Sequence, residues 1–250
     1  MTDPKTYQAA PGLLEGRVIL ITGSTRGIGR TCALACAAHG ATVVLHGRHA
    51  ASLEVVYDEI TAKAYPEPAA IPLDLEKAGT REFDHMAYAI ESQLGRLDGI
   101  VHNAAHLDKL SALEHQSIDE WTRTMRVNVI AAFALTQACA RLLRASPDAS
   151  VIYTSEQHAT QPAAYWGAYA VSKSALETTA IIQADEWSRL THLRANVVVP
   201  GAVASPSRSK THPGELSDSL PAAQSLMPLY LYLLGPDSRG VSGRIFRAQD

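Results

Sequence analysis

The chain alternates short apolar runs with longer stretches of helical pattern. Residues 17–22 (RVILIT) are mostly β-branched and apolar and end before a glycine, which is typical of a strand buried on both faces. Six further runs of this kind lie at 42–46, 69–73, 99–102, 150–154, 195–199 and 242–247. Stretches of helical length between the runs include 29–39, 52–64 and 117–143. Seven strands alternating with about six helices predict an α/β fold, with a doubly wound, seven-stranded parallel sheet and helices on both faces.

No linker, repeat or change in composition divides the chain, so we expect residues 1–250 to form one domain. Residues 1–15 precede the first strand and are predicted to form a short mobile N-terminal arm. Residues 204–225 are rich in Ser and Pro and follow the carboxyl end of a predicted strand, where ligands bind in open parallel sheets. This segment is predicted to cover a substrate, although its composition also fits an ordinary surface loop.

Composition excludes several classes of function. The chain is 46% hydrophobic and 19% charged, and its formal charge is −3. A general binder of nucleic acid or of an anionic membrane needs a basic surface, so neither partner is expected. No run approaches the roughly 18 apolar residues of a transmembrane helix, and the N-terminus lacks the features of a secretory signal. Three cysteines are too few for a disulfide framework and favour a reducing cytoplasm.

Cys32 and Cys36 are four residues apart and share one face of a predicted helix. A zinc site would need further ligands of matching spacing, and buried thiols on an Ala-rich helix are the simpler interpretation. The sequence therefore predicts no metal site.

A glycine-rich loop follows the first predicted strand and opens a helix. Gly23 permits a tight turn, Gly27 removes side-chain bulk where a pyrophosphate approaches the backbone, and Gly29 lets the helix pack closely on the sheet. The free N–H groups and the dipole at the helix N-terminus favour phosphate. We therefore expect a Rossmann-type dinucleotide site. Its predicted loop contacts are Gly23, Ser24, Thr25, Arg26, Gly27, Ile28 and Gly29.

The spacing G-x-x-x-G-x-G resembles the classical short-chain dehydrogenase/reductase family, and further matches span nearly the whole chain. They are Asp74, residues 102–105 (HNAA), Asn128 and residues 200–205 (PGAVAS). The stretches Gly47-Arg48, 166–169 (WGAY) and 227–231 (MPLYL) are most similar to the bacterial YciK-like branch of that family. The resemblance implies one Rossmann-fold domain and further cofactor contacts. These are Asp74, Leu75, Asn103, Ala104, Thr154, Tyr169, Lys173, Pro200, Gly201, Val203 and Ser205.

Two arginines favour NADP(H) as the cofactor. Proteins that bind NAD place a carboxylate at the end of the second strand, where it binds the ribose hydroxyls. In this chain Gly47 and Arg48 stand at that point, and Arg26 lies close to where the same ribose would sit. Two guanidinium groups suit a 2′-phosphate because they pair with it bidentately and keep their charge.

Tyr169 and Lys173 form the predicted chemical centre. They are one helical turn apart, so their side chains share a helix face. The resemblance implies that Tyr169 donates a proton to the substrate oxygen as hydride arrives, and that Asn128 supports a water connected to Lys173. A free phenol has a pKa of about 10, and we expect the positive charge of Lys173 to lower that value. Lys173 would also hold the nicotinamide ribose.

Glu156 stands thirteen residues before Tyr169, where the family has a serine that polarises the substrate carbonyl. An ionised carboxylate would repel a developing oxyanion and raise the pKa of Tyr169. A protonated carboxyl group in a dry pocket would donate a hydrogen bond, as the serine does. The carboxylate could also form an ion pair with Lys173 or with a cationic substrate, or the side chain could turn to solvent. Ser155 is adjacent but should face the opposite side of the strand.

Three rings, those of His158, Tyr165 and Trp166, fall between Glu156 and Tyr169. They are predicted to line the substrate entrance and favour an apolar or planar substrate, although rings at these positions could equally be packing residues.

The leading hypothesis is an NADP(H)-dependent oxidoreductase that acts on a small carbonyl or alcohol compound, with Tyr169 as acid/base. The alternative is an NADP-binding protein with weak or no turnover, because Glu156 replaces the serine. Members of the family are usually homotetramers or homodimers. By that resemblance, residues 227–234 and the long helix after Tyr169 are expected to pack between subunits.

Overall fold

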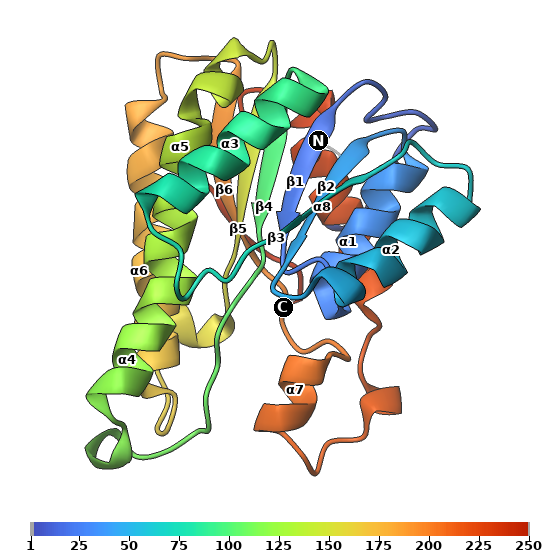
Figure 1. The fold of residues 1–250 in the computed structure, drawn as a ribbon. Helices are drawn as coiled ribbons and strands as arrows, with labels where there is room; N and C mark the ends of the chain where they lie inside the picture. The colour runs from blue at the N-terminus through green and yellow to red at the C-terminus, as the bar shows by residue number, and fades with distance from the viewer. Residues whose placement is uncertain (1–2, 250) are drawn as a thin grey trace.

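A seven-stranded parallel sheet forms the centre of the computed structural model, which describes residues 3–249 (Figure 1). The strands are β1 Val18–Thr22, β2 Thr42–Gly47, β3 Ala69–Pro72, β4 Gly99–His102, β5 Ala149–Thr154, β6 Leu193–Val199 and β7 Ile245–Arg247. Their order across the sheet is β3-β2-β1-β4-β5-β6-β7, and every neighbouring pair is parallel. The predicted fold is therefore confirmed. The order reverses between β1 and β4, and ligands bind at such a switch point beyond the carboxyl ends of the strands.

Helices cover both faces of the sheet, and each face has its own apolar core. One face carries α3 Thr80–Leu94, α4 Ile118–Met125, α5 Ala131–Ala145 and α6 Gly167–Glu186, and the other carries α1 Gly27–Ala38, α2 Ala50–Ala62 and α8 Met227–Leu234 (Figure 1). Short 3-10 turns lie at Pro4–Thr6, Leu113–His115, Gln157–Ala159, Ser217–Ser219, Ala223–Leu226 and Pro236–Ser238. The central strands are buried on both sides, which explains why they lack an apolar–polar alternation.

The predicted helix at 117–143 is a single continuous helix with a π-helical turn, Arg126–Ile130, between α4 and α5. Residues 118–145 pass a test of length and apolar composition for crossing a membrane, but buried core helices pass the same test. Because α5 packs on α3 and contributes Leu135, Cys139 and Leu143 to the core, this result is only weak support for a membrane span.

Two expectations about packing are wrong. Residues 3–15 of the predicted mobile arm pack on the domain, because Tyr7 and Leu14 are buried and Tyr7 Oη donates to Asp237 at 2.8 Å; residues 1 and 2 lie outside the described residues. The Tyr7 ring also packs edge-on against Tyr232 in α8. The apolar stretch 227–234 is α8 itself, which packs against α1 inside the subunit and has little apolar surface left for a second copy.

The segment 204–225 contains α7 Pro206–Thr211, one 3-10 turn and the start of a second, and it lies beyond the carboxyl ends of the strands (Figure 1). Gly27 lies opposite its beginning, because a Cβ atom added to this glycine would be 3.6 Å from Pro206 Cδ. That the segment covers a ligand stays a prediction.

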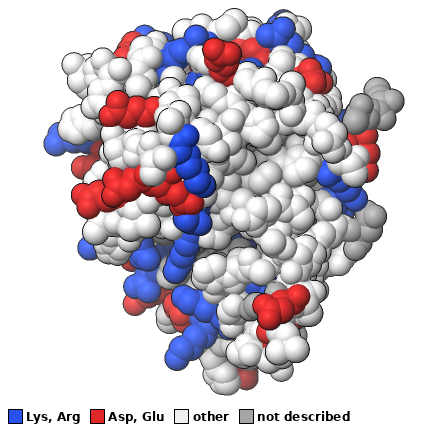
Figure 2. All heavy atoms as spheres, turned by 90° about the vertical axis from the view of Figure 1, so that its right-hand side faces the viewer, with Lys and Arg blue, Asp and Glu red and all other residues white. Residues whose placement is uncertain are grey.

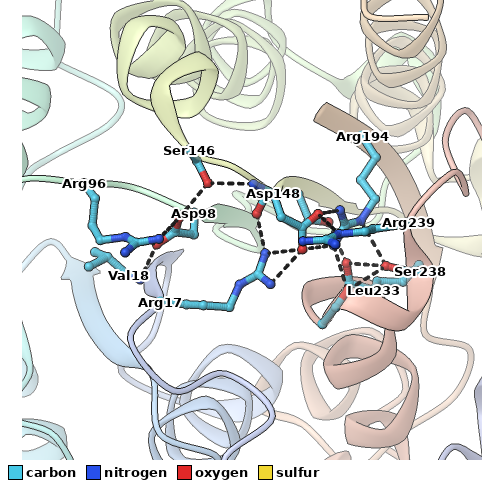
Figure 3. Close-up of polar contacts among 12 residues, drawn as sticks. Arg17, Val18, Arg96, Asp98, Ser146, Asp148, Arg194, Leu233, Ser238 and Arg239 are labelled. Atoms are coloured by element: carbon cyan, nitrogen blue, oxygen red, sulfur yellow. Dashed lines mark hydrogen bonds and ion pairs between the residues drawn. The ribbon is translucent and has the colours of Figure 1, made fainter. Parts of the chain in front are cut away.

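Ionic contacts connect the opposite, amino-terminal edge of the sheet (Figure 3). Asp148, just before β5, pairs with Arg17 at 2.8 Å, with Arg194 of β6, and with Arg239 at 3.5 Å. Asp98, just before β4, accepts the backbone N–H of Val18 at 2.9 Å. These contacts join β1, β4, β5 and β6 at one end, while the carboxyl ends of the same strands carry the candidate site.

The face shown in Figure 2 is largely uncharged in its middle. Lys and Arg side chains lie beside Asp and Glu side chains toward its margins. This face therefore presents no broad surface of one sign.

Candidate active site

The glycine-rich loop runs from the end of β1 into α1. Gly23 and Gly27 have φ angles of 67° and 53°, a region that favours glycine. A Cβ atom on Gly29 would lie 2.2 Å from the carbonyl oxygen of Gly23, so no larger residue fits there without moving the backbone. Asn103 Nδ2 donates to the carbonyl oxygens of Thr22 and Gly23 at 3.2 and 3.3 Å. The loop is thus fixed by its own glycines and by the end of β4.

The loop also contacts the end of β2. The backbone N–H and the hydroxyl of Ser24 both donate to the carbonyl oxygen of His46, at 3.0 and 3.2 Å. A Cβ atom on Gly47 would lie 2.8 Å from Thr25 Cγ2, so a larger residue is also disfavoured at the end of β2. Arg26 follows Thr25 in the loop, Arg48 follows Gly47 at the end of β2, and both arginines are exposed. Within residues 3–249, neither guanidinium lies within ion-pair distance of a carboxylate, so both remain available to a phosphate.

The other predicted cofactor contacts lie at the carboxyl ends of β3, β4 and β6. The backbone N–H groups of Asn103 and Ala104 both donate to the Thr22 hydroxyl, at 3.0 and 3.1 Å. Leu75 lines a small cavity together with Thr22, Ala104 and Asn128. Asp74 accepts the backbone N–H of Glu76, which shapes the turn after β3.

After β6 the chain turns at Gly201, whose φ is 74°. Pro200 and Val203 are buried, and Ser205 caps α7 by accepting the backbone N–H of Arg208 at 3.2 Å. The predicted contact residues after β1, β4 and β6 therefore meet at one edge of the sheet.

Tyr169 and Lys173 lie in the first turns of α6 and face the carboxyl end of β5. Lys173 is 2% exposed, and its ammonium donates to the carbonyl oxygen of Thr154 at 2.7 Å. The Nζ atom lies 5.6 Å from the centroid of the Tyr169 ring. Burial lowers the pKa of Lys173 to about 8, although the carboxylates of Glu156 and Glu177 oppose this shift.

The pKa of Tyr169 moves in the opposite direction from the expected one. Burial raises it well above its usual range, and the Glu156 carboxylate raises it further. The expectation that Lys173 lowers this pKa is therefore wrong for the arrangement seen here. At neutral pH the phenol stays protonated and can act as a proton donor.

Asn128 lies in the π-helical turn and is fully hydrogen-bonded. Its Oδ1 accepts the backbone N–H of His106 at 2.7 Å, and its Nδ2 donates to the His106 carbonyl and to Ser172 Oγ, at 3.0 and 2.9 Å. Ser172 in turn donates to the carbonyl oxygen of Tyr169 at 2.7 Å. Asn128 thus positions the first turns of α6, and its expected water link to Lys173 stays a prediction.

Glu156 is the second residue after β5 and caps the short turn Gln157–Ala159 by accepting the backbone N–H of His158 at 2.8 Å. The half-buried carboxylate is close enough to influence Tyr169 and Lys173 electrostatically. Ser155 turns the other way and donates to Glu177 Oε1 at 2.6 Å. Ser155 therefore cannot take the place of the missing serine, as the alternation of strand residues predicts.

Aromatic rings gather next to Tyr169. Trp166 packs against His158, Tyr169 and His212, with centroid distances of 4.2, 5.9 and 6.2 Å. Tyr165, Trp166 and Tyr169 line one pocket together with residues 107–110. Tyr165 has a φ of 76°, a strained value for a residue with a side chain. The rings predicted at the entrance thus surround Tyr169.

Two residues of the site were missed from the sequence. Glu177 is a buried carboxylate one turn after Lys173, and its four-residue spacing from that lysine was the available signal. His212, from the segment 204–225, reaches Trp166, and no sequence pattern pointed to it. Within residues 3–249, no group of three or more His, Cys, Asp or Glu side chains could hold a metal ion, and Cys32 and Cys36 are buried with their Sγ atoms 3.9 Å apart.

The family model for short chain dehydrogenases matches residues 17–216. The uncharacterized oxidoreductase YciK of Escherichia coli K12 is 39% identical over 243 residues, which cover 97% of this chain and 96% of YciK. A solved structure from Pseudomonas syringae is 44% identical, covers 100% of both chains and has a TM-score of 0.96. A solved structure from Shigella flexneri 2a, complexed with NADP, is 38% identical, covers 96% of this chain and 100% of its own, and has a TM-score of 0.93.

Proposed function

Because the chain belongs to the short-chain dehydrogenase family of oxidoreductases, we propose that it transfers hydride between NADP(H) and a small carbonyl or alcohol compound. The arrangement of Tyr169 and Lys173 carries this proposal. A protonated phenol and a buried ammonium group lie together beside a pocket, at the edge of the sheet where the glycine-rich loop ends. This is the pairing that a proton transfer to a carbonyl oxygen requires.

NADP(H) fits the residues present. The start of α1 and the loop before it would bind the pyrophosphate, because they offer free N–H groups and little side-chain bulk. Arg26 and Arg48, both without a carboxylate partner among residues 3–249, would bind the 2′-phosphate. The related Shigella flexneri structure complexed with NADP supports this choice. When bound, NADPH supplies hydride for reduction.

Tyr169 donates its phenolic proton to the substrate oxygen during reduction. With its pKa raised, Tyr169 holds this proton at neutral pH but is also a weaker acid than a free phenol. Oxidation needs the same group as a base, which favours more alkaline conditions. Asn128 holds the backbone of α6 at Tyr169 through Ser172 and thereby positions the phenol.

A second candidate function follows from Glu156. Its carboxylate raises the pKa of Tyr169, which works against proton donation, and it stands where the family has a hydroxyl donor. The alternative is therefore an NADP-binding protein with little or no turnover. A panel of aldehydes and ketones with NADPH, tested on the wild type and on Glu156→Ser, separates the two functions. Turnover by the wild type supports the oxidoreductase, whereas turnover by Glu156→Ser alone supports the alternative.

The cofactor choice is tested with Arg26→Ala, Arg48→Ala and the double variant. A hydrogen bond to a charged group contributes about 1.5–3 kcal/mol, so each substitution should weaken NADPH binding about ten- to a hundredfold. Binding of NADH, which lacks the 2′-phosphate, is the control and should change little. Equal weakening for both cofactors would show that the arginines act on the fold of the loop rather than on the phosphate.

Exposed apolar side chains on α5, α6 and the π-helical turn support a homo-oligomer. They are Ile130, Phe133, Val171, Ile181 and Ile182. Pairing with a second copy would remove this surface from water. A mass measurement in solution, repeated on Phe133→Asp with Ile182→Asp, tests this. The wild type should be a dimer or tetramer, and a monomeric wild type would contradict it.

A further inference from the structure

Among residues 3–249 the carboxylate of Glu156 has no ion-pair partner, although Lys173 and Arg208 are close enough to interact with it electrostatically. Lys173 directs its ammonium to the carbonyl oxygen of Thr154 at 2.7 Å. Arg208 forms a two-pronged ion pair with Glu215, at 2.6 and 2.9 Å. Among residues 3–249 no Lys, Arg or His nitrogen lies within 4.0 Å of the Glu156 carboxylate. Within the part of the chain that the structure describes, one backbone N–H, that of His158, donates to this carboxylate, and its other acceptor positions have no partner.

Aromatic rings and further carboxylates lie beside Tyr169, the residue on which Glu156 acts electrostatically. Trp166 packs against His158 and Tyr169, and the faces of such rings attract cations. The pocket beside Tyr169 is lined by the acidic residues Asp108 and Glu120 and by one lysine, Lys109. Glu156 does not line this pocket itself, but its carboxylate acts electrostatically on Tyr169, which does. A ligand cation bound beside Tyr169 would therefore meet aromatic rings and feel the charge of this carboxylate.

A simple ketone fits this site poorly. Its oxygen gains negative charge as hydride arrives, and the unpaired carboxylate at the position of the missing serine repels that charge. An ammonium group on the carbon next to the carbonyl would remove the conflict. It would pair with the carboxylate on one side and donate a hydrogen bond to the developing oxyanion on the other, which is the role of the missing hydroxyl.

Building on the proposed function, we infer that the substrate is a 1,2-amino carbonyl compound in its ammonium form, with the corresponding vicinal amino alcohol as the product, and that Glu156 binds its ammonium group. In this reaction the carbonyl carbon accepts hydride from NADPH, and the electron pair of the C=O π bond moves to oxygen. The oxygen takes the phenolic proton of Tyr169, and the resulting phenolate recovers a proton from solvent. NADP⁺ and the protonated amino alcohol are the products, and the ammonium group is unchanged.

The test uses two matched pairs of probes. Protonated 2-aminoacetophenone and propiophenone differ by an ammonium in place of a methyl group, as do 2-amino-1-phenylethanol and 1-phenyl-1-propanol. Calorimetry on the NADP⁺-loaded protein gives the affinities of the two alcohols, and NADPH oxidation gives kcat/KM for the two ketones. The variants are Glu156→Gln, which keeps the shape and removes the charge, and Glu67→Gln. Glu67 precedes β3, at the amino edge of the sheet, and is the matched control.

We expect the wild type and Glu67→Gln to favour the ammonium compound of each pair about tenfold or more. Glu156→Gln should lose most of this preference. The inference is overturned if the wild type shows no preference for the ammonium compound, or if Glu156→Gln keeps it. The binding arm separates this result from turnover: charge-dependent binding without NADPH oxidation would contradict the proposed function and leave the cation site standing. Equal reduction of both ketones would contradict the cation site and leave the proposed function standing.

Discussion

Replacing Asp148 by Asn tests how the amino-terminal edge of the sheet is held together (Figure 3). The substitution keeps the shape of the side chain and removes its charge. Asp148 accepts hydrogen bonds from Arg17 at 2.8 Å and pairs with Arg194, whose side chain is 2% exposed. The variant therefore leaves two guanidinium groups facing a neutral amide in a site that water hardly reaches.

The expected cost follows from this burial. Removing one partner of a buried ion pair typically costs about 3–5 kcal/mol, because the remaining charge stays desolvated. Such a loss is a large share of the roughly 5–15 kcal/mol that stabilises a domain. We expect Asp148→Asn to lower the free energy of unfolding by about 3 kcal/mol or more. Arg194 should retain its hydrogen bonds to Ser238 and to the carbonyl oxygen of Gly235, at 2.9 and 2.7 Å.

Urea unfolding at pH 7, followed by circular dichroism and by tryptophan fluorescence, measures this difference. Arg239→Met is the matched control, because the Arg239 side chain is 60% exposed and lies 3.5 Å from the same carboxylate. Arg239→Met should lower the free energy of unfolding by less than about 1 kcal/mol. A change below about 1 kcal/mol for Asp148→Asn would refute the reasoning.

The same network predicts a dependence on pH. Burial opposes ionisation of Asp148, but the hydrogen bonds from Arg194 and Arg17 outweigh it and lower the pKa of this carboxyl. Its contribution to stability is thus present above the unfolded pKa, near 3.9, and is lost as pH falls through the folded pKa. The difference in stability between wild type and Asp148→Asn should narrow in acid.

Two further predictions concern the site. Gly29→Ala places a Cβ atom 2.2 Å from a backbone oxygen and should weaken NADPH binding by roughly five- to a hundredfold. Gly214→Ala is the control, because a Cβ atom there meets no atom within 4 Å, and it should leave the affinity for NADPH unchanged. Fluorescence titration with NADPH measures both, and equal affinities would contradict the role of the glycine. Glu156 raises the pKa of Lys173, so the alkaline limb of kcat/KM, near pH 8 in the wild type, should move to lower pH in Glu156→Gln. An unchanged limb, or one moved to higher pH, would contradict this assignment.

The fold could be predicted from the sequence because its signals are local. Strands buried on both faces read as short apolar runs, and the glycines after β1 are required by the backbone itself. The resemblance to short-chain dehydrogenases and to YciK is confirmed. It could be recognised from the sequence because its motifs are short and lie at strand ends. The strand bounds differ from the prediction by at most three residues at either end.

Packing between distant segments was harder to predict. Residues 227–234 are apolar on all sides, a pattern shared by a subunit interface and a buried helix, and only contact with α1 decides between them. Tyr7 and Leu14 belong to a stretch too short and polar to show periodicity, yet α8 and the end of α1 bury them. In each case the deciding partner is far away in the sequence.

For the pKa of Tyr169 the sequence offered two opposing effects, a lowering by Lys173 and a raising by an ionised Glu156, and it could not decide between them. The spacing to Lys173 is correct for a neighbouring positive charge, but the lysine directs its ammonium to the Thr154 carbonyl. Burial and the Glu156 carboxylate then dominate the pKa of the phenol. Which of several nearby groups controls a buried phenol depends on distances that spacing along one helix does not give.

The rate of NADPH oxidation by the wild type and by Tyr169→Phe, with 2-aminoacetophenone and the carbonyl panel, tests the central claim most directly. The variant lacks only the hydroxyl and should bind NADPH as the wild type does. We predict that the wild type oxidises NADPH with at least one of these compounds and that Tyr169→Phe is slower by roughly a hundredfold or more. A wild type that binds NADPH but oxidises none of it, or a Tyr169→Phe variant that keeps the wild-type rate, would contradict the account.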